Sequence, residues 1–179
     1  MSGVDESSTA PDTAGRVAEI AARKGEAAVS MLGMPDAATI VIAADTMLDM
    51  GGVSLGKPHD AATARARLHD MSGSCGVLHT GHYVATGGPG GPWRHLVDVA
   101  STVVRFAAMS DAEIDAYIAT GEPLEVAGSF TIDGLGGPFI SGIEGDPSNV
   151  VGLSLPLLRV MLAKLGVPWT SLWGSAATA

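Results

Sequence analysis

The sequence has little of what marks secreted, membrane-spanning or nucleic-acid-binding proteins. A single cysteine, Cys75, excludes an internal disulfide and fits a reducing compartment. No apolar run approaches the ~20 residues that a membrane span requires. Lys and Arg number 10 against 19 Asp and Glu, and the net charge of -9 argues against a surface for a nucleic acid polymer. An acidic protein can still bind a nucleoside triphosphate if a divalent cation bridges the charges.

The N-terminal stretch 1–15 is polar and acidic and lacks the basic region of a signal peptide, so we expect a cytoplasmic protein. The length of 179 residues and the hydrophobic share of 46 % suit one domain with a substantial core, and we treat 1–179 as that domain. The Gly/Pro-rich loop at 87–92 is the only candidate boundary. The segments on either side of it look like hairpin partners, which favours a single domain.

Helical and strand patterns alternate along the chain, which indicates the α/β fold class. Caps and apolar spacing predict helices at about 13–31, 60–71, 110–119 and 155–165. The expected caps are Asp12 or Thr13, Asp60, and Ser110 with Glu113 in a capping box. Strands are expected at 40–44, 76–86 and 93–107, with a hairpin turn at 49–52 and strand-like pieces within 128–149. The strand at 40–44 shows no alternation, which predicts that both of its faces are covered.

Two charged residues follow this first strand. Asp45 ends the predicted strand, and ligands of open α/β sheets bind at the carboxyl ends of strands. There it could bind a metal or accept a proton from water, or it could simply cap a turn. Lys57 stands between Gly56 and Pro58, on a stiff loop that can approach a ligand. It could hold a phosphate or be an ordinary solvated lysine.

A third charged residue lies on the first predicted helix. Lys24 falls on the apolar stripe of that helix, whose other members are Val17, Ile20, Ala21, Ala28 and Met31. Either its side chain extends along the helix to water, or this face lines a pocket.

The remaining candidates are weaker. Glu6 could ligate a metal or belong to a polar tail, and Asp133 could contact a ligand or cap a glycine turn. We interpret the histidines and Cys75 as structural, because no two histidines share a helical metal spacing and no base stands beside the cysteine. The histidines are at positions 59, 69, 79, 82 and 95.

Taken together, the motifs form a recognisable set. They are VIAADTM (41–47), LGKP (55–58), ARARLHDMSG (64–73), TGH (80–82), AYIATGEPLEVAGSFTIDGLGG (116–137) and IEGDPSNVVGLSLPL (143–157). In this order they resemble the Maf family, the septum-formation-inhibitor-like nucleoside triphosphate pyrophosphatases, over nearly the whole chain.

The resemblance implies a fold and an activity. The fold would be a mixed twisted sheet with flanking helices and a two-lobed cleft, like that of inosine triphosphatases. The reaction would convert a nucleoside triphosphate, including a non-standard one, to the monophosphate and pyrophosphate with Mg²⁺ or Mn²⁺. Such house-cleaning of nucleotides is linked to division arrest in the family. Dimers are common there, so a homodimer is one expected state.

The resemblance also implies roles for individual residues. Asp45 would accept a proton and bind the metal together with Glu6. Thr46 would sit beside the substrate, while Lys24 and Lys57 would hold phosphates. The mechanism would be mainly electrostatic and positional.

Two departures from the family pattern matter. Pyrimidine-directed members carry glutamine in an Ile-Gln-Gly triplet where this chain has Asp133, and an ionised aspartate offers only acceptors, so the base preference stays open. The family's first strand and its S-x-R-R-like phosphate loop precede the VDE segment at which this chain begins. We therefore expect an exposed sheet edge and a lower rate. The alternatives are a truncated, inactive nucleotide-binding or division-regulating protein, and a plain phosphatase that releases orthophosphate.

Overall fold

A five-stranded sheet organises the computed structural model, which describes residues 5–173. The strands are β1 (Thr39–Met50), β2 (Val53–Leu55), β3 (Cys75–Gly87), β4 (Arg94–Phe106) and β5 (Ile140–Glu144), in the spatial order β2-β1-β3-β4-β5. Every pairing between these strands is antiparallel. The α/β class with flanking helices is confirmed, but the sheet of the described residues is not mixed, because neighbouring strands run in opposite directions throughout.

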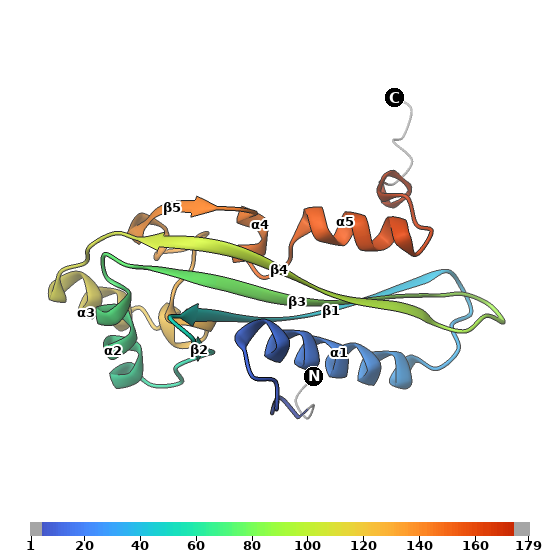
Figure 1. The fold of residues 1–179 in the computed structure, drawn as a ribbon, viewed down its shortest axis with the longest axis horizontal. Helices are drawn as coiled ribbons and strands as arrows, with labels where there is room; N and C mark the ends of the chain where they lie inside the picture. The colour runs from blue at the N-terminus through green and yellow to red at the C-terminus, as the bar shows by residue number, and fades with distance from the viewer. Residues whose placement is uncertain (1–4, 174–179) are drawn as a thin grey trace.

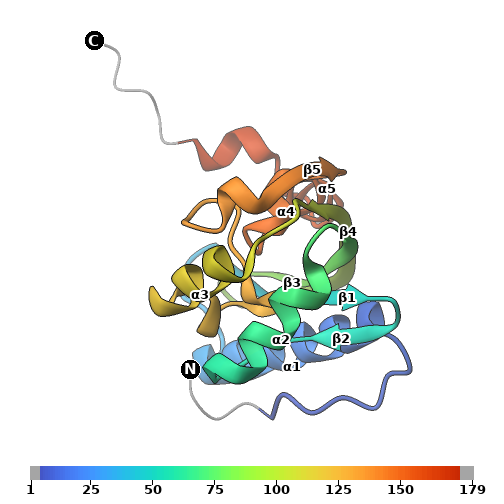
Figure 2. The same cartoon turned by 90° about the vertical axis from the view of Figure 1, so that its left-hand side faces the viewer.

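Helices cover both faces of this sheet (Figures 1 and 2). α1 (Thr13–Leu32) lies along one face, whereas α4 (Pro147–Val150) and α5 (Leu155–Lys164) lie on the other. At one end of the sheet gather α2 (Ala61–Met71), α3 (Asp111–Ala119) and the short turns η1 (Glu122–Leu124), η2 (Ala127–Ser129) and η3 (Gly137–Phe139). The turn η4 (Trp169–Leu172) follows α5. None of the helices in residues 5–173 combines the length and the apolar character that crossing a bilayer requires.

The helix starts follow the capping signals of the sequence. The side chain of Asp12 caps α1 and that of Asp60 caps α2. Ser110 and Glu113 form the predicted capping box of α3. All four predicted helices are confirmed, as is the β1–β2 hairpin, whose turn is built from two glycines with positive φ.

β1 is longer than predicted, and this changes the position of Asp45. The strand runs on to Met50, so Asp45 lies in its middle rather than at its end. The prediction that both faces are covered is wrong, because Ile42 is 44 % exposed. β2 pairs only with Leu48–Met50, so within the described residues the stretch 39–47 has no partner strand on its outer side. Asp45 therefore lies beside a stretch of β1 without a partner strand in the described residues, not at a carboxyl end.

Two smaller predictions also fail. Met31 is 79 % exposed instead of belonging to the buried stripe, because the last turn of α1 leads into an exposed loop. Within 128–149, only Ile140–Glu144 forms a strand, and the rest is turns and the start of the short helix α4.

Separate apolar clusters fix the helices to the sheet. On the α1 face, Tyr83 and its neighbours Val41 and Ala85 pack against the helix. On the other face, Val84 packs against Leu158, Met161 and Leu162 of α5 and against Leu165, which directly follows that helix. Burying each such large side chain stabilises the fold by about 1.5–3 kcal/mol.

Two glycines let α1 lie unusually close to the sheet. A Cβ added to Gly81 on β3 would stand 2.1 Å from the carbonyl oxygen of Val17, and one added to Gly25 on α1 would stand 2.0 Å from the ring of Tyr83. Gly25 follows Lys24, and Gly81 pairs directly with Asp45 across the sheet. The close approach therefore places Lys24 beside Asp45.

Candidate active site

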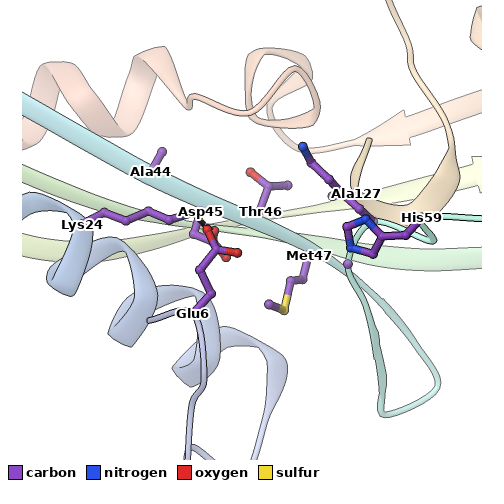
Figure 3. A pocket seen from close by; sticks show the side chains of 10 residues that line it. Glu6, Lys24, Ala44, Asp45, Thr46, Met47, His59 and Ala127 are labelled. Atoms are coloured by element: carbon purple, nitrogen blue, oxygen red, sulfur yellow. Dashed lines mark hydrogen bonds and ion pairs between the residues drawn. The ribbon is translucent and has the colours of Figure 1, made fainter. Parts of the chain in front are cut away.

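A cavity of about 540 Å³ opens at the exposed edge of β1, between α1 and the loop that follows β2 (Figure 3). Its lining comes from five separate stretches of the chain, which are Glu6, Lys24, the β1 residues Ala44–Met47, the loop residues Gly56, Lys57 and His59, and Ala127. Five residues that the sequence singled out thus lie on one cavity. They are Glu6, Lys24, Asp45, Thr46 and Lys57.

An ion-paired group occupies one side of the cavity (Figure 3). The Nζ of Lys24 donates to Asp45 Oδ1 at 2.6 Å and lies 2.8 Å from Glu6 Oε1. The side chain of Asp45 is 12 % exposed and that of Glu6 is 64 % exposed. The side chain of Lys24 is 25 % exposed and lines the cavity, as the second of its two alternatives expects.

Burial and pairing act in opposite directions on these charges. Burial raises the pKa of Asp45, and the carboxylate of Glu6 adds to this, so the pKa stays above its usual value despite the bond from Lys24. Burial lowers the pKa of Lys24, but its bonds to Asp45 and Glu6 outweigh burial and raise the pKa above its usual value. The site thus holds a firmly charged ammonium beside a carboxylate that accepts a proton more readily than an exposed aspartate does.

Lys57 reaches the same cavity from the loop between β2 and α2. The carbonyl oxygen of Gly56 accepts from Arg67 Nη1 at 2.7 Å and from the backbone N–H of Gly128 at 3.2 Å. These two bonds tie the loop to α2 and to the turn η2. Sequence reasoning missed Arg67, because a helical arginine gives no local sign of which distant carbonyl it will contact.

A second, smaller cavity of about 200 Å³ adjoins the first on the other face of β1. Thr46 and Ala127 line both cavities. Successive residues of a strand point to opposite faces, so Thr46 turns away from Asp45, and its hydroxyl bonds Thr80 Oγ1 at 3.0 Å. The remaining lining is mostly apolar, with Asp133 as its one carboxylate; it comprises Leu78, Val126, Phe130, Thr131, Asp133, Val150, Val151 and Gly152.

Glu122 holds the loop that carries Asp133. Its carboxylate accepts from Tyr117 Oη at 2.9 Å, from Thr131 Oγ1 at 2.5 Å, and from the backbone N–H groups of Leu135 and Gly136 at 3.1 Å each. The bond from Thr131 leads the causes that lower the pKa of Glu122. Asp133 is thus not part of the ion-paired group but stands on a braced loop at the neighbouring cavity.

Comparison with known proteins bears on the whole chain. The model of a family described as Maf-like protein matches residues 1–165. This chain belongs to the Maf family. It is 53 % identical over 175 residues to a nucleoside triphosphate pyrophosphatase of Salinispora tropica, with 97 % of this chain and 76 % of that protein covered. It is 50 % identical over 178 residues to a protein of the same name from Streptomyces coelicolor, with 98 % and 84 % covered. A third such relative, from Nocardia farcinica, is 43 % identical over 179 residues.

The donor groups of this Maf chain bear on the expected divalent cation. Among residues 5–173, no group of three or more His, Cys, Asp or Glu side chains could hold a metal ion. Glu6 and Asp45 are nevertheless two hard oxygen donors that reach the same ammonium. Mg²⁺ is commonly bound by one or two carboxylates together with substrate phosphates and water. The residues therefore fit a cation whose remaining ligands would be phosphates and water.

Two of the histidines, His82 and His59, lie in different surroundings. His82 is fully buried: its Nδ1 bonds the Thr80 carbonyl at 2.9 Å, and its Nε2 accepts from the Ser154 backbone N–H at 2.8 Å, which agrees with a structural role. His59, interpreted as structural from sequence, lines the first cavity. Its spacing from Lys57 was the available signal, since both stand on the short loop before α2.

Proposed function

We propose that this Maf chain hydrolyses a nucleoside triphosphate to the monophosphate and pyrophosphate with the help of a divalent cation. The observation that carries the proposal is Asp45, a mostly buried carboxylate with a raised pKa in a cavity that Lys24 and Lys57 also line. The relatives from Salinispora tropica and Streptomyces coelicolor are named for the same reaction class, which supports the proposal.

In the proposed reaction, Asp45 accepts a proton from water as the water oxygen attacks the α-phosphorus. The bond from that phosphorus to the bridging oxygen breaks, and pyrophosphate leaves with the bonding electrons. Lys24 and Lys57 stabilise the negative charge on the phosphate oxygens. Glu6 and Asp45 would hold the cation, which supplies further neutralisation of the phosphate charge when bound.

The two adjoining cavities suggest how a nucleotide would lie. The lysine-lined cavity suits the phosphates, and the apolar cavity beyond Thr46 suits the nucleoside. There Asp133, when ionised, would accept hydrogen bonds from a base or sugar but could not donate one. The base preference would then follow from which donors a nucleotide presents to Asp133.

The deciding experiment is a product analysis with a panel of nucleoside triphosphates and either Mg²⁺ or Mn²⁺. We expect monophosphate and pyrophosphate from the wild type, and a loss of about 10²–10⁴-fold in kcat for Asp45→Asn, which keeps the shape but removes the base. Asp70→Asn, at an exposed position on α2, is the matched control and should keep full activity. Orthophosphate as the product would support a plain phosphatase instead, and a well-folded wild type without turnover would favour the inactive alternative.

The homodimer and the cytoplasmic location remain predictions. Light scattering on the purified protein would measure the first, and fractionation of cells that express it would measure the second.

A further inference from the structure

His59 adopts a backbone conformation that its neighbours impose. Its φ is 64°, and among the described residues only one other non-glycine, Ser129, has a positive φ. Pro58 before it is buried, and Asp60 after it caps α2, so both flanking positions are fixed. Glycine adopts such a φ without strain, whereas an L-residue does so at a cost. The chain thus carries a side chain where glycine would be more stable.

This side chain faces the first cavity. Figure 3 shows the ring of His59 near Ala127, across the cavity from Glu6, Lys24 and Asp45. The residue is exposed, and within residues 5–173 its ring nitrogens make no hydrogen bond or ion pair with the protein. The carboxylates opposite are already bonded to Lys24, which leaves an N–H of the imidazole available to a ligand.

Two donors thus stand two positions apart on one loop. Lys57 and His59 both line the cavity, and Gly56, directly before them, is held by Arg67 and by the backbone of Gly128. A phosphate chain offers several acceptor oxygens, so an ammonium and an imidazole N–H on a braced loop suit it. One N–H suffices, and the neutral ring always carries one, so the contact does not require a protonated histidine.

We propose that His59 contacts the substrate by donating a hydrogen bond to the phosphate chain that Lys57 holds. The inference rests on the proposed function and adds a specific residue to it. The strained backbone then has a use, because it is the conformation in which the ring lines the cavity. The competing explanation is that the strain only joins Pro58 to α2 and that the side chain is incidental.

Three variants separate these explanations. In His59→Ala and His59→Gly the donor is lost, so we expect KM for the nucleoside triphosphate and the dissociation constant for inorganic pyrophosphate, measured by calorimetry with Mg²⁺, to rise on the order of 10-fold. His59→Gln keeps an N–H donor and should recover part of this loss. His59→Gly should also melt at a higher temperature than His59→Ala, because glycine relieves the strain. His69 is exposed on α2, its ring faces Asp111 of α3, and it lines neither cavity, so His69→Ala should change neither constant.

The result that would overturn the His59 contact differs from the result that would overturn the proposed function. A wild type that turns over substrate while His59→Ala and His59→Gly keep its KM and pyrophosphate affinity would overturn the contact alone. A wild type that neither turns over nor binds pyrophosphate would overturn the proposed function, and the contact with it.

Discussion

At the scale of single residues, the site depends on the ammonium group of Lys24, which lies between two carboxylates. Lys24 offsets the charge of Asp45, which is largely withdrawn from water, and of Glu6, which is not. Removing one partner of a buried pair leaves the other charge uncompensated, which costs more than the pair itself contributes. Lys24 therefore serves both the charge balance of the protein and the proposed substrate.

This dual role predicts the behaviour of Lys24→Met. Without the ammonium, the pKa of Asp45, already raised by burial, should rise further, so less of it is ionised to accept a proton. The phosphates would also lose one positive partner. We expect kcat/KM to fall on the order of 100-fold. Each tenfold part of this fall corresponds to about 1.4 kcal/mol of lost transition-state stabilisation.

The chain supplies a matched control, because it contains only three lysines. Lys164 lies exposed at the end of α5, outside both cavities, and Lys164→Met should keep kcat/KM within about twofold. Equal losses in the two variants would mean that Lys24 acts only through general charge.

At the scale of elements, activity depends on how closely α1 lies on β3. The backbone of Val17 leaves no space for a Cβ at Gly81, and backbone cannot yield as a flexible side chain can. Because Gly81 pairs with Asp45, any outward shift of α1 moves Lys24 away from its partner. The same geometry thus governs stability and chemistry.

Gly81→Ala tests this coupling. We expect a loss of about 1–3 kcal/mol in the free energy of unfolding from overpacking, measured by urea denaturation. At temperatures where the variant is still folded, kcat/KM should also fall, because the distance between Lys24 and Asp45 increases. Gly142→Ala on β5 is the control: its Cβ would meet Arg105 at an ordinary 3.6 Å, so neither quantity should fall. Full activity in folded Gly81→Ala would contradict the coupling.

At the scale of the whole molecule, local signals in the sequence were sufficient for some features and not for others. Capping residues and turn glycines act within a few positions, so Asp12, Asp60 and Ser110 marked helix starts correctly. Strand direction and register depend on distant partners. The run 40–44 therefore gave no sign that β1 continues to Met50 or that its neighbours are antiparallel.

The residues of the candidate site also divide into those that the sequence indicated and those that it did not. The family resemblance singled out Glu6, Lys24, Asp45 and Lys57, and these residues line one cavity. Asp133, which the sequence also singled out, lines the adjoining cavity. His59 was missed because its role depends on a φ of 64°, which the sequence of a loop does not specify.

His82 joins the central sheet to the start of α5, and it gives the fold a dependence on pH. Burial lowers the pKa of His82, although its bond to the Thr80 carbonyl and the nearby Asp98 and Asp146 act the other way. In its neutral form, Nε2 accepts the backbone N–H of Ser154, the cap of α5, and protonation would turn that acceptor into a donor. The folded protein therefore resists protonation that the unfolded chain accepts.

The sign of the effect follows from this difference in proton binding. An unfolded histidine has a pKa of about 6.5, so below that pH the unfolded chain binds more protons than the fold until the folded pKa is passed. Stability is full above about pH 6.5 and falls as the pH decreases, by up to about 1.4 kcal/mol per pH unit for one proton. His82→Gln offers both an acceptor and a donor without titrating, so urea unfolding between about pH 7.5 and 5 should show a shallower fall for it than for the wild type. Asp45, with its raised pKa, acts in the opposite sense, but it is present in both proteins and cancels in the difference. Parallel curves would mean that His82 becomes protonated in the fold without loss of its bond to α5.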